Sequence, residues 1–327
     1  MTSLFRNSRT YVALFVVLLL LFPFIVGQSS YYMGLAVTAC MYAIAAIALN
    51  LLTGYGGQVS VGHSGFMVIG AYTVAILADR FDTPIWLTLP AAGVVSAIVG
   101  FFLGLPATRL RGHFLAVATL GFGLSMPAIA LNWESLTEGY SGLAVMRPDL
   151  VSSDLAFFYV FVALTAFITW MSINIAKSRM GRAFVAVRDS EVAAAATGIN
   201  VSYYKTIMFT VSAFFTGIAG GLYAYWVGFV SPNDYTIVAS FLLLAMIVVG
   251  GLASIWGAIF GAILLTVIPH FTDEYVGVTD LIIGIAVMIV VLLRPAGIAS
   301  LGQLFRRRAA EPDTADASKN KKEASSI

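Results

Sequence analysis

The feature that most constrains this chain is the absence of charge over long stretches. From Thr10 to Ala78 it carries no Asp, Glu, Lys or Arg, and Tyr235 to Thr272 is equally bare. Only 10% of the 327 residues are charged and 60% are hydrophobic. So few charged residues cannot cover the surface of a water-soluble enzyme of this size. Uncharged runs of about 20 residues match the hydrocarbon thickness of a bilayer. Helices satisfy their own backbone there, so the sequence predicts an all-α, polytopic helical membrane protein.

Hydropathy and charge spacing predict about ten membrane-spanning helices. The expected spans are 11–27, 31–53, 59–78, 84–106, 113–132, 154–176, 206–229, 235–249, 255–269 and 280–293. Ten spans place both termini in the cytoplasm, together with every basic residue except Arg80 and Arg147, as the positive-inside rule requires. Nine spans would put the C-terminal basic residues outside and are rejected, whereas eight spans with residues 255–280 re-entrant remain an alternative.

The two ends of the chain are interpreted from their composition. No small-x-small cleavage site follows the first apolar run, so we expect an uncleaved helix rather than a signal peptide. We expect a transmembrane domain over residues 1–305, which includes a cytoplasmic loop at 177–205. Residues 306–327 are polar and charged, and we expect them to form a disordered cytoplasmic tail.

The uncharged segment 50–72 is too rich in glycine and polar side chains to be an ordinary lipid-facing helix. Glycine costs about 1 kcal/mol relative to alanine inside a helix. A broken backbone at membrane depth is tolerated only where it is buried in protein or lines a wet cavity. The segment is therefore either part of a solute pathway or a site of close packing with polar side chains as glue. The candidate pathway residues are Asn50, Gly54, Gly57, Gln58, Ser60, Gly62, His63 and Ser64.

The cytoplasmic loop 177–205 is expected to contain one short helix. Asp189 or Ser190 can cap its free backbone N–H groups, Glu191 lies in its first turn, and Gly198 can end it in the left-handed conformation. A helix of about eight residues is not stable alone in water. It must dock on its own membrane domain or on a partner, and its small alanine side chains favour a partner.

Later in the chain, Gly250-Gly251-x-x-Ser254 repeats the pattern Gly56-Gly57-x-x-Ser60. The repeat indicates either a duplicated half or nothing more than local similarity, whereas the small residues Gly257 and Gly261 predict a face for close helix packing. The single cysteine and the absence of a Cys/His cluster predict neither a disulfide nor a metal or other cofactor. Near-neutral charge argues against nucleic acid as a partner, and the long uncharged runs predict membrane lipid as the surroundings.

Four runs in this order resemble the permeases of branched-chain amino acid ATP-binding-cassette transporters, the LivM/LivH family, and especially its LivM-like branch. The runs are 54–72, 110–122, 181–191 and 250–257. The resemblance implies a membrane subunit of an ATP-driven importer in the bacterial inner membrane. It also implies three kinds of partner: a second, related permease, two cytoplasmic ATPases and an extracytoplasmic binding protein.

The resemblance further implies that the cytoplasmic loop couples the permease to the ATPases. The implied coupling residues are Gly181, Arg182, Arg188, Asp189, Glu191, Ala194 and Gly198. The family pattern has Glu-Ala-Ala with a glycine six residues after the glutamate. Here Val192 follows Glu191, and the glycine lies seven residues on, so the register of the ATPase contact departs from that pattern.

The predicted function is import of branched-chain amino acids by alternating access, with urea or short amides as the alternative cargo. The chain lacks the G-x-x-x-x-G-K-[ST] phosphate-binding motif, so ATP hydrolysis is expected in partner subunits. A self-sufficient secondary transporter would usually carry charged residues within its spans, and none falls mid-span. An intramembrane enzyme is not expected either, because His63, His113 and His270 lie in separate segments without matching acids.

Overall fold

The computed structural model describes residues 22–25, 27, 29–110, 112–147, 153–272 and 278–293. Its apolar helices are α2 (Ser30–Asn50), α3 (His63–Phe81), α4 (Ile85–Ala107), α5 (His113–Asn132), α7 (Asp154–Lys177), α10 (Val201–Val227), α11 (Ile237–Gly250), α12 (Ile255–Thr272) and α13 (Val278–Leu293). Seven helical segments in the described part are long and apolar enough to cross a membrane, and α12 and α13 contribute shorter apolar stretches. The predicted all-α membrane architecture is confirmed. The first expected span and the tail 306–327 lie almost wholly outside the described residues.

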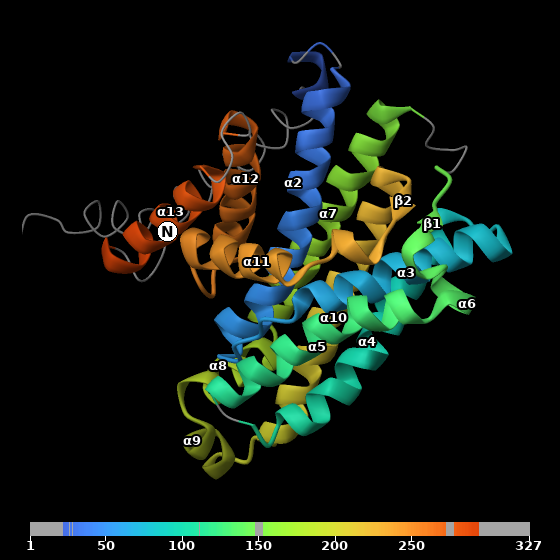
Figure 1. Cartoon of the computed structure of the whole chain (residues 1–327). Coiled ribbons are helices and arrows are strands. Elements are labelled where there is room, and N and C mark those ends of the chain that lie inside the picture. Colours follow the sequence, from blue (N-terminus) through green and yellow to red (C-terminus); the bar gives the residue numbers. More distant parts are fainter. Residues whose placement is uncertain are drawn as a thin grey trace, which may run out of the picture.

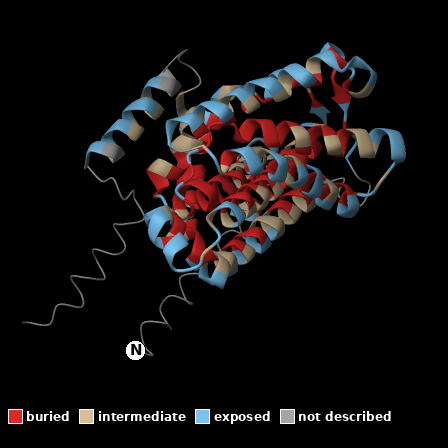
Figure 2. Cartoon of the chain, turned by 90° about the horizontal axis from the view of Figure 1, so that it is seen from below, coloured by how far each residue is buried: buried red, intermediate tan, exposed pale blue. Residues whose placement is uncertain are grey.

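Two helices form the centre of the bundle. In both α10 and the α2 segment, 72% of the most apolar stretch is buried, against 22% in α5. Helix α10 packs against α3 and α4, and α2 packs against α7 and α12, as Figure 1 shows. Figure 2 shows the buried residues concentrated in this middle, with exposed residues on the outer helices. The exposed sides carry large apolar residues such as Phe102, Phe114 and Trp170, which suits contact with lipid.

Glycines set the closest helix contacts. A β-carbon at Gly70 of α3 would lie 2.0 Å from the carbonyl oxygen of Gly217 in α10, and one at Gly220 would lie 2.1 Å from that of Met67. A β-carbon at Gly261 of α12 would lie 2.0 Å from the carbonyl oxygen of Met246 in α11. The packing face predicted around Gly257 and Gly261 is therefore confirmed, since side chains here would hold the backbones apart.

The glycine-rich segment breaks the bundle as expected, but at a different place. Helix α2 continues as a turn of π-helix, η1 (Leu51–Tyr55), and residues 56–62 then run without regular structure before α3 begins at His63. The span was expected to begin at 59, which is wrong by four residues. Gly57 has φ +68, a conformation that interrupts a helix and favours glycine.

The loop 177–205, expected to be cytoplasmic, is more helical than predicted. It contains α8 (Arg179–Asp189) and α9 (Glu191–Ala196), and α10 already begins at Val201 rather than at 206. Ser178 caps α8 by accepting from the backbone N–H groups of Met180 and Gly181. Helix α8 has apolar residues on its buried side and arginines elsewhere, so it packs on the bundle by its amphipathic face.

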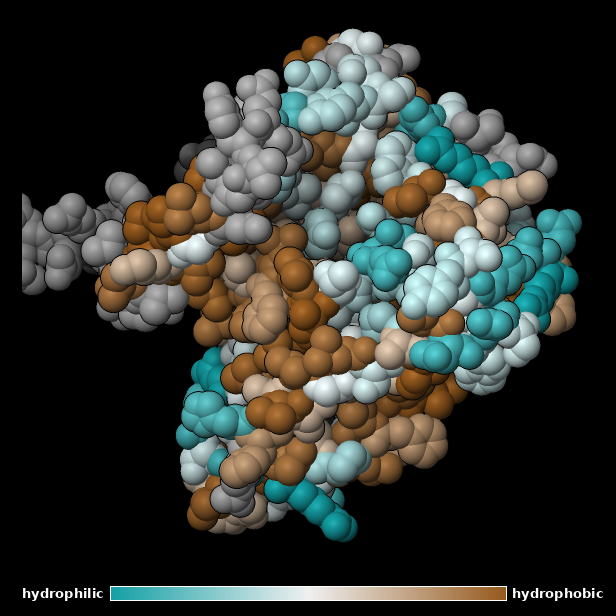
Figure 3. All heavy atoms as spheres, in the orientation of Figure 1, coloured by the Kyte–Doolittle hydropathy of each residue, from teal (hydrophilic) through white to brown (hydrophobic). Residues whose placement is uncertain are grey.

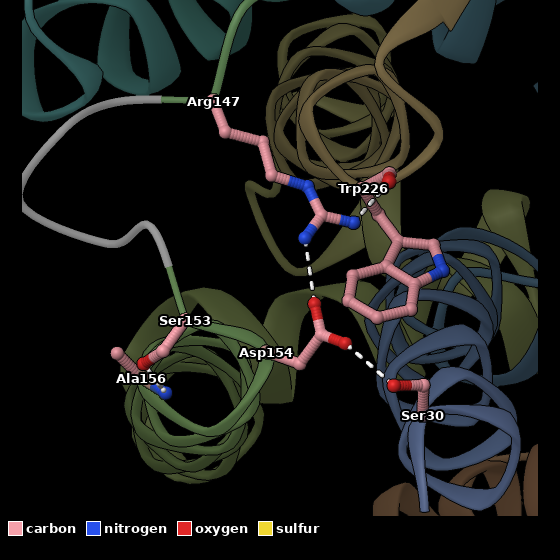
Figure 4. Close-up of polar contacts among 6 residues, drawn as sticks. All are labelled: Ser30, Arg147, Ser153, Asp154, Ala156 and Trp226. Atoms are coloured by element: carbon pink, nitrogen blue, oxygen red, sulfur yellow. Dashed lines mark hydrogen bonds and ion pairs between the residues drawn. The ribbon is translucent and has the colours of Figure 1, made fainter.

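A polar cluster ties together several chain segments at the opposite end of α10 from α8 and α9 (Figure 4). Strand β1 (Leu143–Ala144) pairs antiparallel with β2 (Phe229–Val230), and Arg147 follows β1. Its guanidinium pairs with Asp154 at 2.6 Å and lies 5.0 Å from the centre of the Trp226 ring. Ser30 donates to the other carboxylate oxygen of Asp154 at 3.0 Å. The starts of α2 and α7 are thereby held against the end of α10.

Candidate solute pathway and coupling surface

Asn50, at the end of α2, holds the turn between α11 and α12. Its side chain is fully buried. The Oδ1 atom accepts from the Ala253 N–H at 2.9 Å, and Nδ2 donates to the Ser254 carbonyl at 2.8 Å. Ala253 has φ +58, which costs an alanine about 1–2 kcal/mol. Asn50 thus satisfies its own polar atoms while holding a strained turn.

Gly54, in η1, allows the Asn50 side chain to approach the turn at Ala253 this closely. A β-carbon at Gly54 would lie 2.0 Å from Asn50 Oδ1 and 2.4 Å from the Ala253 nitrogen, distances that no side chain can occupy. The repeated Gly-Gly-x-x-Ser patterns therefore lie on segments that meet in space. The first glycine-rich segment packs on the turn that contains the second.

His63 is the centre of a buried hydrogen-bond relay. Its Nδ1 lies 3.0 Å from Ser60 Oγ and its Nε2 lies 2.7 Å from Ser212 Oγ of α10. The Ser212 hydroxyl donates to the carbonyl of Ala48 at 2.7 Å, so Ser212 must accept from His63. We therefore assign the neutral tautomer with the proton on Nε2, in which Ser60 donates to Nδ1. Every polar atom of the ring is satisfied within the protein.

The start of α3 is held against two more helices. The Ser64 N–H donates to Ser240 Oγ of α11 at 2.8 Å, and the Ser240 hydroxyl donates to Ser64 Oγ at 2.9 Å. A β-carbon at Gly62 would lie 1.9 Å from the Thr119 carbonyl oxygen of α5, and Thr119 Oγ1 accepts from the Val61 N–H. Gly62 is thus required for the close contact with α5.

Gln58 differs from its neighbours because its polar atoms are poorly satisfied. The side chain is 4% exposed, and its Oε1 has no hydrogen-bond partner. Its Nε2 points to the Met208 sulfur at 3.9 Å, a weak acceptor. Gln58 is therefore the member of the predicted pathway set that has hydrogen-bonding capacity to spare.

The short helix expected in the 177–205 loop is confirmed as α9, and its docking on a partner stays a prediction. Ser190, and not Asp189, is its cap, since Ser190 Oγ accepts from the Ala193 N–H at 3.2 Å. Gly198 follows the helix with φ +85, and Ala194 is buried against the protein. Glu191 pairs with Lys205 at 2.5 Å, so α9 is tied to the first turns of α10. Val192 is 76% exposed.

Helix α8 connects α9 to the glycine-rich segment 50–64. Arg188 Nη1 donates to the Gly54 carbonyl at 3.0 Å, and the guanidinium also pairs with Asp189 at 2.9 Å. A β-carbon at Gly57 would lie 2.6 Å from Arg188 Cγ. At the other end of α8, Gly181 meets the Ala176 carbonyl closely, while exposed Arg182 donates to the Lys177 carbonyl.

The structure thus brings two sets of predicted residues together at the contact of Arg188 with Gly54 and Gly57. Sequence reasoning missed the partners on distant helices, which are Met208, Ser212 and Ser240, and it noted Ser254 only as part of the repeated pattern. Each is a single small or flexible residue in an apolar or glycine-rich stretch, and nothing in its local pattern distinguishes it. Whether the polar residues of segment 50–64 line a pathway stays a prediction.

Comparison with known proteins agrees with this architecture. The family model described as branched-chain amino acid transport system, permease component, matches residues 31–292. The LivM high-affinity branched-chain amino acid transport permease of Salmonella typhimurium is 32% identical over 89% of this chain and 75% of that protein. The Escherichia coli LivM and LivH permeases are 31% and 26% identical, over 89% and 79% of this chain and 75% and 90% of their own lengths. No solved structure matches.

The permeases of this family are inner-membrane proteins, which agrees with the seven long apolar helices and with the predicted location. The family match covers both the glycine-rich segment and the helices α8 and α9. The chain belongs to the permease family of branched-chain amino acid transport systems.

Proposed function

We propose that this chain is the membrane-spanning subunit of an ATP-driven importer for branched-chain amino acids, and that it performs no covalent chemistry itself. The single observation that carries the proposal is the contact of Arg188 with Gly54. It joins the surface expected to meet the ATPases to the glycine-rich break in the bundle. The relatives are named as permeases of branched-chain amino acid transport systems, which supports this cargo over urea or short amides.

In this proposal α8 and α9 contact the ATPases and are displaced by them. Exposed Val192 and the small alanines of α9 provide a shallow surface for a partner. The pair Glu191–Lys205 ties α9 to α10, and Arg188 ties α8 to η1. A displacement of the two short helices therefore moves two of the central spans. Alternating access needs such a two-state packing, which nucleotide binding in the partners would bias.

The distribution of buried charge supports an external energy source. Among the described residues, Lys205 is the only charged side chain that is buried. It lies at the start of α10 and pairs with Glu191, far from the middle of a span. Ion-coupled transporters usually carry charged groups along the ion path. The polar residues of the segment 50–64 are neutral, which suits passage of a zwitterion without tight binding.

Reconstitution tests the proposal. The chain would be co-purified with its second permease, the ATPases and the binding protein, and the complex placed in proteoliposomes. We expect uptake of radiolabelled leucine that requires ATP and the binding protein, and no uptake by the chain alone. ATP-driven uptake of urea and not leucine would establish the alternative cargo. Solute accumulation by the chain alone under a proton or sodium gradient would overturn the proposal.

A further inference from the structure

Four tyrosines from four different elements come together in the half of the bundle away from α8 and α9. Tyr42 lies on α2, Tyr72 on α3 and Tyr223 on α10. Tyr235 lies between η4 (Pro232–Asp234) and α11. The rings of Tyr223 and Tyr235 meet edge to face at 5.7 Å. The Tyr235 phenol is close enough to the other three, and to Asp234, to interact with them electrostatically. We call these four residues the tyrosine cluster.

Two hydroxyls of the tyrosine cluster are buried without a partner. Tyr72 is 5% exposed and Tyr235 is 1% exposed, and neither hydroxyl makes a hydrogen bond. A buried polar group left unpaired destabilises the folded protein. Phenylalanine would fill the same space without that cost, so packing alone gives no reason for either hydroxyl. By contrast, Tyr225 is equally buried and its hydroxyl lies 2.8 Å from the Thr88 hydroxyl.

The tyrosine cluster borders the surface. Tyr42 and Tyr223 are partly exposed, and Asp234 is exposed. The face seen in Figure 3 is hollowed between α2 and the segment that joins β2 to α11, and atoms there are mostly white to pale teal rather than brown. Because β2 follows the end of α10 that lies opposite α8 and α9, the hollow faces the side away from the expected ATPases.

The chemistry of the tyrosine cluster favours a cation. Aromatic faces attract ammonium groups, and an unpaired phenol oxygen can accept a hydrogen bond from one. The charged group that interacts with Tyr235, among the described residues, is the carboxylate of Asp234, which would repel a carboxylate ligand. Asp234 Oδ2 accepts from the Ser231 N–H at 3.1 Å, so the carboxylate is fixed beside the cluster.

We propose that the tyrosine cluster is a transient recognition site for the primary ammonium group of the transported solute, with Tyr72 and Tyr235 accepting its hydrogen bonds. This inference rests on the proposed function, because it places the site on the outward half of the solute pathway. The phenols are neutral, so the site would hold an amino acid weakly and release it when the bundle changes state. Urea has no ammonium group and would gain little there.

Three single variants test the site in the complete reconstituted complex. Tyr72→Phe and Tyr235→Phe remove only the unpartnered hydroxyls, and Tyr225→Phe is the matched control on a hydroxyl that has a partner. With the binding protein saturated with leucine, we expect turnover to fall about tenfold in Tyr72→Phe and Tyr235→Phe, because each variant loses a hydrogen bond to a charged group. Their Tm should be equal to or above that of the parent. Tyr225→Phe should lower Tm and leave turnover unchanged.

Direct binding separates the ammonium from the carboxylate. Saturation-transfer NMR on the nanodisc-held complex without binding protein would compare leucine, isopentylamine and 4-methylpentanoate. We expect signals from the two amines that are lost in Tyr72→Phe and Tyr235→Phe and kept in Tyr225→Phe, and no variant-dependent signal from the carboxylate. Parent-like turnover and binding in both variants, or equal binding of the carboxylate, would overturn the inference. If the parent complex takes up no leucine, the proposed function fails instead.

Discussion

Arg188 is the residue whose removal tests the proposed coupling most directly. Its guanidinium is the described link between α8 and the carbonyl of Gly54. Replacement by glutamine keeps a helix-forming side chain of polar character but removes the charge and shortens the reach. The Gly54 carbonyl, near the end of the π-helical turn, then loses its partner in α8.

The size of the effect follows from the geometry. A hydrogen bond from a charged donor contributes roughly 1.5–3 kcal/mol. The Arg188 side chain is 34% exposed, and solvent screening reduces the value to about 1–2 kcal/mol. If this contact transmits the bias of nucleotide to the membrane helices, losing it reduces that bias by roughly 5- to 30-fold in equilibrium terms. We therefore expect Arg188→Gln to lower leucine uptake per ATP hydrolysed by about that factor.

The assay measures uptake and ATP hydrolysis in the same proteoliposomes. Arg179→Gln is the matched control, because Arg179 is an exposed arginine on the same helix and its loss changes the net charge equally. We expect Arg188→Gln to keep its ATPase activity while uptake falls, and Arg179→Gln to keep both. Uptake per ATP that is the same in the parent and in both variants would refute the coupling role of Arg188.

Other substitutions probe neighbouring contacts. Glu191→Gln leaves Lys205 buried without its ion-pair partner, so we expect the free energy of unfolding in detergent to fall by about 1–2 kcal/mol. Tm should fall accordingly and recover in the double variant with Lys205→Met; an unchanged Tm would contradict this. At Gly198 an arginine side chain would extend into open space, although the backbone φ of +85 favours glycine. We expect Gly198→Arg to fold while its uptake per ATP falls. Uptake per ATP equal to the parent's would argue against partner docking at Gly198. Asn50→Leu should lower Tm because the turn at 251–254 loses its hydrogen-bond partner. Gln58→Leu should leave Tm unchanged and lower uptake. Unchanged uptake in Gln58→Leu would mean that Gln58 only packs.

Local signals made part of the site predictable from sequence. The sequence predicts a helix that begins after Asp189 or Ser190 and ends at Gly198, because caps depend on the chemistry of single residues; α9 confirms the helix, with Ser190 as its cap. The break near Gly54 and Gly57 was predictable because glycine is unfavourable inside a helix. Its exact position was not, since the π-helical turn that extends α2 to Tyr55 depends on the contact with the 251–254 turn.

Helix α8 shows a signal that was present and missed. Its buried residues Ala183, Phe184 and Val187 follow the three- and four-residue spacing of an amphipathic helix, but the arginines on either side of them give the segment the charge of a loop. The partners of His63 are a different case. Ser212 lies 149 positions away, and no local pattern in a single sequence reports a contact at that distance.

Helix α11 connects the two places where we infer function. At its end, the turn 251–254 is held by Asn50 and packs on η1, which Arg188 contacts. In its first turn, Ser240 exchanges hydrogen bonds with Ser64, and Tyr235 precedes the helix within the tyrosine cluster. A helix of 14 residues transmits displacement as a rigid body. In the proposed mechanism, a shift of η1 by α8 and α9 therefore changes the surroundings of the Tyr235 hydroxyl, and release of a bound ammonium group and movement of α8 become two consequences of one motion.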